Sequence, residues 1–334
     1  MNAVAKRAGL LLLWLLFLVL TGDARDVARS ELPRFRATDL KTDFATDENA
    51  MFARPVHMAF QDGRLSVVDA EEAAVSVFDP EGRFMGRAGG KGQGPGQLDF
   101  PTAAWPVADG LIVSDGGKRG IVRFDARGRE RGSFRLSFFP EAILPLAGDR
   151  VLVARNPGGG DKKGRILNCH DLRGRLLWSA LPAASSGDRV ADTMSNVVIL
   201  LGGASGEIFA VFRYRAEGIR RFSAAGRDLG EIRPGRAYPV GRIRKTVAPG
   251  KTIRAEVFCW HAAYSEGRFY LLAAARTEDG DFGPGSDVYV IGFDGRIQEV
   301  IELPGTMTKI AASAERLYAL DLDYRLRVLK VERK

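Results

Sequence analysis

One short pattern recurs along this chain: an apolar strand that ends in Phe-Asp or a close variant, a turn, and then Gly-Arg. The copies read FDPEGR at 78–83, FDARGR at 124–129, HDLRGR at 170–175, FSAAGR at 222–227 and, shortened, FDGR at 293–296. Alternating apolar residues precede each copy, and the glycine suits the positive φ of a tight turn between two strands. Recurrence at about 45 residues or more is the sequence sign of a repeat fold.

A second apolar element lies upstream of each turn. Its copies are LSVVD at 65–69, LIVSD at 111–115, VLVAR at 151–155, IFAVF at 208–212, FYLLA at 269–273 and LYALD at 317–321. With a short first strand before it, each unit has four antiparallel strands, which is the blade of a β-propeller. We predict an all-β, six-bladed β-propeller with blades near 55–90, 100–136, 140–182, 193–234, 256–304 and 306–332.

The last unit supplies only three strands. Residues 34–44, near the other end of the chain, contain an alternating segment that can serve as its missing outer strand. We expect this N-terminal strand to pair with the C-terminal blade, because that pairing closes the ring and removes two exposed sheet edges.

The glycine-rich stretch GGKGQGPGQLDFP at 89–101 raises the question of a phosphate-binding loop. No frame of it fits G-x-G-x-x-G or the P-loop spacing, and no amphipathic helix follows. We therefore expect a linker that crosses from the outer strand of the first blade to the inner strand of the second, where glycines let the backbone turn freely.

Residues 73–134, which include this linker, closely resemble the NHL repeat family. Those repeats pair a G-x-G-P-G-Q-[FL] linker with a V-x-D…I-x-x-F-D-x-x-G run, and here GPGQLDFPT stands in the first and VSD…IVRFDARG in the second. The resemblance implies a six-bladed propeller used as a binding platform. Eukaryotic relatives bind proteins or RNA, and one related class is a zinc-dependent lyase that cleaves peptidyl-hydroxyglycines.

The first 24 residues have the pattern of a secretory signal peptide. Lys6 and Arg7 precede an apolar run from Ala8 to Leu20, and small residues end the segment near Ala24. The run is shorter than the roughly 20 residues of a membrane span. We expect a secreted or periplasmic propeller over residues 25–334; an uncleaved N-terminal membrane anchor is the alternative. The two cysteines exclude a disulfide scaffold.

Charged residues follow the second strands, whose ends point to one face of a propeller. Three units end in Asp69, Asp115 and Asp321, and three others carry Arg155, Arg213 and Arg276. The linker 232–255 adds seven basic residues and no acidic one: Arg233, Arg236, Arg242, Arg244, Lys245, Lys251 and Arg254. Such a basic flap would attract an anion by its field and by bidentate hydrogen bonds. The alternative is structural: aspartates that cap turns, arginines paired between blades, and a solvated loop.

The ligand-binding residues that we predict are Arg155, Arg213, Arg276, Arg242, Arg244 and Lys245. His57 and His261 fall on first strands near the central channel, where the lyase relatives place three zinc-binding histidines. Two histidines with no visible third ligand are a weak metal site. We expect Trp105, Trp260 and Tyr264 to pack between blades, and we predict no cofactor and no catalytic residue.

The sequence favours an exported, non-enzymatic binding platform for a protein, a peptide or an anionic glycan. The alternative is a metal-dependent propeller lyase or hydrolase with its site in the channel. The formal net charge of +8 raises a third possibility, nucleic-acid binding. Export argues against it, and so does the lack of an aromatic and basic stripe for single strands.

Overall fold

The computed structural model describes residues 31–40, 48–157, 164–248, 251–278 and 280–333. The predicted signal peptide, residues 1–24, and the alternative membrane anchor lie outside these residues. Within them, no helix has the length and apolar character needed to cross a membrane.

Four antiparallel sheets of four strands each follow one another along the chain. The first contains β2 (Pro55–Gln61), β3 (Arg64–Asp69), β4 (Ala74–Phe78) and β5 (Phe84–Gly89). The second contains β6 (Pro101–Val107), β7 (Gly110–Asp115), β8 (Gly120–Asp125) and β9 (Glu130–Arg135). The third contains β10 (Ala142–Leu146), β11 (Arg150–Ala154), β12 (Arg165–Asp171) and β13 (Leu176–Pro182). The fourth contains β14 (Val198–Gly202), β15 (Ile208–Phe212), β16 (Ile219–Phe222) and β17 (Asp228–Ile232).

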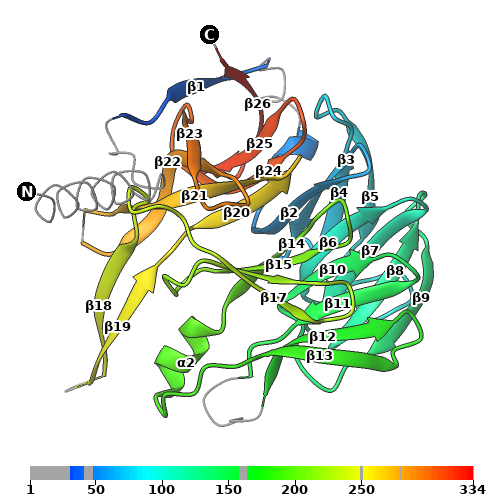
Figure 1. Cartoon of the computed structure of the whole chain (residues 1–334). Coiled ribbons are helices and arrows are strands. Elements are labelled where there is room, and N and C mark those ends of the chain that lie inside the picture. The colour runs from blue at the N-terminus through cyan, green and yellow to red at the C-terminus, as the bar shows by residue number, and fades with distance from the viewer. Residues whose placement is uncertain (1–30, 41–47, 158–163, 249–250, 279, 334) are drawn as a thin grey trace, which may run out of the picture.

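A fifth sheet has eight strands in the order β20-β21-β22-β23-β1-β26-β25-β24. Its strands are β20 (His261–Ser265), β21 (Arg268–Arg276), β22 (Phe282–Ile291), β23 (Ile297–Glu302), β24 (Met307–Ala312), β25 (Leu317–Asp321), β26 (Leu326–Glu332) and β1 (Arg34–Asp39). As expected, β1 pairs antiparallel with the C-terminal strand β26. It also pairs in parallel with β23, which the sequence did not indicate, and so joins two four-stranded halves into one sheet (Figure 1).

The first strands of the four smaller sheets and the two edge strands of the eight-stranded sheet contact one another in a closed cycle, in the order β2, β6, β10, β14, β20 and β24. The other strands of each sheet follow outward from this central ring. The molecule is therefore an all-β propeller. Between its sheets lie a 3-10 helix η3 (Glu48–Ala50), a short helix α2 (Arg189–Ser195), and a separate hairpin of β18 (Gly241–Ala248) and β19 (Lys251–Val257) that extends away from the ring in Figure 1.

In three of its copies, the recurring turn is stabilised by the same set of hydrogen bonds. The carboxylate of Asp79 accepts the backbone N–H groups of Glu81 and Arg83 at 3.0 and 2.8 Å. The side chain of Arg83 pairs with the same carboxylate at 2.6 Å, and Gly82 has a φ of 81°. Aspartates 125 and 171 repeat this arrangement. The carboxylate replaces water as the acceptor for turn N–H groups, which explains why Asp and Gly recur together.

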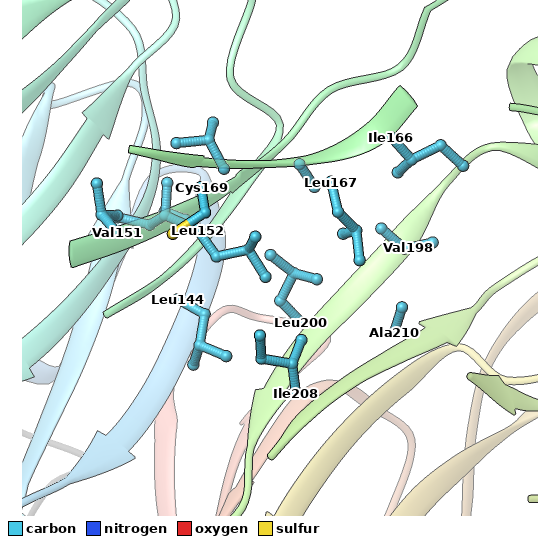
Figure 2. Packing of buried hydrophobic residues seen from close by; sticks show 14 of the residues in the cluster. Leu144, Val151, Leu152, Ile166, Leu167, Cys169, Val198, Leu200, Ile208 and Ala210 are labelled. Atoms are coloured by element: carbon cyan, nitrogen blue, oxygen red, sulfur yellow. The ribbon is translucent and has the colours of Figure 1, made fainter. Parts of the chain in front are cut away.

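Neighbouring sheets are held by apolar side chains that interdigitate between them. Figure 2 shows one such interface, where side chains from the third and fourth sheets meet: Leu144, Leu152, Leu167, Val198, Leu200 and Ile208. All are at most 7% exposed. Burial on both faces explains why the second strands read as continuous apolar runs rather than as alternating ones.

The glycine-rich stretch 89–101 links β5 to β6 as a folded crossing. Leu98 is fully buried and forms a parallel bridge with Lys91. Gly89 has a φ of 92°, and a Cβ atom there would lie 2.7 Å from the Leu98 side chain. Glycine at position 89 is thus required both by the backbone conformation and by the close approach of Leu98.

Candidate functional site

The inner strands surround a central cavity of about 510 Å³. At one end it reaches the turns that follow the first strands, such as those at Asp62, Ala147 and Glu266. His57 and His261 line it farther along the same strands. Trp105 and Tyr264 also line the cavity, although we expected them only to pack between blades.

Strand register places six side chains at one level of the inner ring. They pair with the residues at the same position of the six second strands: Val68, Ser114, Ala154, Val211, Leu272 and Leu320. The six are His57, Ala103, Ala142, Ile199, His261 and Lys309. Because β20, β24 and β2 are consecutive in the ring, His261, Lys309 and His57 occupy one half of this level and three small or apolar residues the other half.

Both channel histidines are held by the next strand of the ring. The backbone N–H of Ala104 donates to His57 Nδ1 at 3.4 Å, and that of Ile310 donates to His261 Nδ1 at 3.4 Å. With Nδ1 as the acceptor, the proton of each neutral ring is on Nε2. Burial, followed by the nearby Lys309 ammonium, lowers the pKa of His57 to about 3. The same two causes hold the pKa of His261 well below its usual range.

Lys309 is the functional candidate that the sequence did not reveal. Burial, followed by the positive charge of Arg213, lowers the pKa of Lys309 to about 8. No ion pair involves Lys309 within the described part of the chain. A single lysine in an apolar strand carries no motif, and its level in the ring depends on a register shift after Met307 that only the structure reveals.

Arg213 completes this group at the end of β15. Its guanidinium lies 4.8 Å from the ring centre of Trp260 and 5.3 Å from that of Tyr214. Its Nε is buried and has no hydrogen-bond partner among the described residues. The positive charge of Arg213 also contributes to the lowered pKa of both Lys309 and His261. We call His57, His261, Lys309 and Arg213 the channel cluster.

The other two predicted arginines have surroundings of their own. Arg155 donates from Nε to the carbonyl of Arg165 at 3.0 Å and stacks 5.5 Å from the Phe138 ring. Arg276 is exposed at the end of β21, 5.4 Å from the Phe282 ring. Of the three, Arg213 is the one whose charge acts on the channel histidine and lysine.

Asp69 and Asp115, at the ends of two second strands, do not present an acidic surface on this face. Both are buried, and their carboxylates accept backbone N–H groups instead. Asp69 accepts from Ala53 at 2.7 Å and from Glu71 at 2.9 Å. Asp321 likewise binds its own turn, accepting two backbone N–H groups at 3.0 and 2.9 Å. These aspartates cap turns and linkers, as the structural alternative held.

The predicted basic flap contains the β18–β19 hairpin. Arg242 is exposed, and its guanidinium lies 3.8 Å from the Glu256 carboxylate on the facing strand. Arg244 and Lys245 lie in β18 opposite Arg254 and Ile253; the placement of their side chains is outside the described part of the structure. At the base of the hairpin, the N–H of Phe258 donates to the carbonyl of Arg213 at 2.8 Å. Helix α2 contacts β19.

For a metal, the described residues offer no group of three or more His, Cys, Asp or Glu side chains. His57 and His261 do lie at one level of the channel. His170, the third histidine, lies in β12, where its Nδ1 bonds the Gly174 carbonyl at 3.2 Å.

No family model and no curated protein matches this chain. Among solved structures, a DUF4221 family member from Bacteroides vulgatus matches with a TM-score of 0.58 and 13% identity, covering 91% of this chain and 98% of that one. A protein of Bacteroides fragilis described as exported matches with a TM-score of 0.56 and 11% identity, covering 92% and 97%. Virginiamycin B lyase from Staphylococcus aureus matches with a TM-score of 0.52 and 12% identity, covering 90% and 100%. At these identities the likeness shows the fold alone: this chain is similar to β-propeller proteins over nearly its whole length.

Proposed function

We propose that this chain is an exported, six-bladed, NHL-like β-propeller that acts as a binding platform for an anionic partner, either an acidic protein or peptide or an anionic glycan. Six inner strands in a closed cycle support the count of blades, with β20–β23 as the fifth and β24–β26 plus β1 as the sixth. The signal-like N-terminal sequence and the exported neighbour support export.

One observation carries the binding proposal: the cationic hairpin and the cationic end of the channel are joined. The chain leaves β19 and bonds directly to the Arg213 backbone before it enters β20. Segment 232–255 contains seven basic residues and no acidic one. A partner with negative charge can therefore contact the hairpin and the channel end together, with Arg155 and Arg276 as further contacts of this surface.

The test is a triple charge reversal in the hairpin: Arg242→Glu, Arg244→Glu and Lys245→Glu. Retention on heparin and on immobilised polyglutamate is measured against salt concentration. We expect the variant to elute from both matrices at much lower salt than the parent, because the attraction is electrostatic. The matched control reverses three exposed basic residues elsewhere, Arg127, Arg173 and Lys330. Equal weakening by both triple variants would mean that only net charge matters and would contradict the proposal.

A second candidate is a metal-dependent lyase or hydrolase with its site in the channel. The specific observation in its favour is that His57 and His261 share one level of the channel. Virginiamycin B lyase has the same fold, which is likeness of fold alone. Elemental analysis of the purified protein before and after chelation tests it. A stoichiometric metal that His57→Asn and His261→Asn abolish would favour the enzyme; its absence would leave the binding platform.

A further inference from the structure

The channel cluster offers only hydrogen-bond donors. Arginine and lysine side chains have no acceptor atom. The Nδ1 atoms of His57 and His261 already accept backbone N–H groups, so each ring has its Nε2–H left to donate. Four side chains on neighbouring elements thus present donor groups and positive charge without an acceptor among them.

The positive charge of the cluster is not neutralised within the described residues. No ion pair joins a carboxylate to Arg213 or Lys309 there. On or next to the inner strands, the carboxylate nearest to this level is that of Glu141, one residue before β10 and on the opposite half of the ring. Burial alone raises the pKa of Glu141, and no cation contributes, so Glu141 does not serve as the counter-ion of the cluster. Lys309 and Arg213 are half-buried. Charge withdrawn from water is normally paired in folded proteins, and none of the described carboxylates pairs with these two side chains.

We propose that the channel cluster binds an oxyanion group of a ligand, a carboxylate or a phosphate. The inference rests on the proposed binding function and deepens it by assigning the channel end of the site. The guanidinium and the ammonium supply charge, and the imidazole Nε2–H groups supply directed donors. Trp260 supports the Arg213 guanidinium from one side. On the opposite half of the level, Ala103 and Ala142 are small and Ile199 lines the cavity. The cavity of about 510 Å³ can hold the body of a ligand.

The experiment titrates the full mature chain with inorganic phosphate and, separately, with acetate at fixed ionic strength. Calorimetry and the fluorescence of Trp105 and Trp260 report binding. We expect saturable binding of at least one probe, and tighter binding of phosphate or of acetate identifies the preferred oxyanion. We also expect proton uptake at pH 8, measured in buffers of different ionisation enthalpy, because a bound anion raises the pKa of Lys309 from about 8.

Lys309→Met removes one charge from the cluster while keeping side-chain length, and Lys330→Met removes one exposed charge from the outside of the ring. We expect Lys309→Met to weaken binding by about tenfold or more and to abolish proton uptake, Lys309→Arg to retain binding, and Lys330→Met to change neither. Should Lys309→Met not fold, Arg213→Gln replaces it. Unchanged binding in the cluster variant, an equal loss in Lys330→Met, or no saturable binding of either probe would overturn the proposal.

The outcomes also separate this inference from the proposed function. Charge reversal in the hairpin should weaken retention on heparin and polyglutamate and leave the binding of small oxyanions intact. Lys309→Met should weaken the binding of small oxyanions and leave retention on heparin and polyglutamate intact. A parent protein that is not retained on either matrix but still binds small oxyanions would contradict the platform and keep the channel site.

Discussion

At the scale of single residues, Asp115 shows how one carboxylate fixes the path of a blade. It is fully buried and accepts the backbone N–H groups of Asp99, Phe100 and Lys118 at 2.9, 3.1 and 3.0 Å. These donors belong to the incoming linker and to the turn after the second strand. The carboxylate therefore adds three hydrogen bonds where these two segments meet, beside the backbone bond from the Gly116 N–H to the Phe100 carbonyl at 2.7 Å.

We predict that Asp115→Ala lowers the free energy of unfolding by about 2–4 kcal/mol, because three backbone donors lose their acceptor. Asp109→Ala, at an exposed turn of the same sheet, should change it by less than about 0.5 kcal/mol. Urea unfolding of both variants measures the difference. A comparable effect of the two substitutions would show that Asp115 does not organise the linker.

A second residue-scale prediction concerns acid. The pKa of His57 is about 3 in the folded chain and about 6.5 when unfolded. The unfolded state therefore takes up this proton first, and stability that is complete above pH 6.5 is lost as pH falls towards 3. We expect a loss of the order of 3 kcal/mol from this residue. His57→Asn, which keeps an acceptor for the Ala104 N–H, should flatten the decline in urea unfolding between pH 7 and pH 4; a curve parallel to that of the parent would refute this.

At the scale of elements, strands and turns could be predicted from the sequence because their causes are local. Alternating apolar residues indicate the strands, and the recurring aspartate and glycine residues indicate the turns, each within a stretch of a few residues. The β18–β19 hairpin was predicted only as a basic linker, although Pro249-Gly250 lies between two alternating runs. The many charged residues in these runs obscured the alternation that would have predicted a hairpin. Helix α2 was missed too, because seven residues are too few for a helical period to emerge.

We predict that the hairpin adds little to stability. None of the five buried apolar clusters includes a residue between 241 and 256 among those described. Replacing residues 243–254 by a short glycine-serine turn should shift the thermal midpoint by less than about 3 °C, which is about 1 kcal/mol for a domain of this size. A larger drop in a thermal melt would make the hairpin part of the core instead.

At the scale of the whole molecule, the need for a closing strand was visible in the sequence because the last unit lacked an outer strand. The parallel pairing of β1 with β23 could not be predicted from the sequence, because it depends on how closely the two four-stranded halves of the sheet approach each other. The candidate site likewise contains residues whose positions could be predicted from the sequence and one whose position could not. The strand positions of His57 and His261 followed from the repeat, whereas the place of Lys309 beside them depends on register and on ring closure.

We predict that Ala37→Asp opens the ring. Ala37 is 3% exposed and lies opposite Val331 in the pairing of β1 with β26. A carboxylate there has no partner and should lower the free energy of unfolding by several kcal/mol, with a less steep denaturant transition because the closing strand detaches first. Arg36→Gln is the control, since that side chain is 82% exposed. An unchanged denaturant slope with Ala37→Asp would mean that the closing strand does not detach before the rest of the ring unfolds, and it would contradict this prediction.

The position of β1 sets the order of assembly. Its partners in β26 lie almost a full chain length away, as the 294-residue separation of Thr38 and Glu332 shows. During synthesis β1 is made before its two partners, β23 and β26, which lie in about the last 40 residues of the chain. Such a contact is among the slowest to form, because the loop that it closes spans the whole domain. A nascent chain can therefore form its four local sheets one after another, but it cannot close the ring until its last strands have been made.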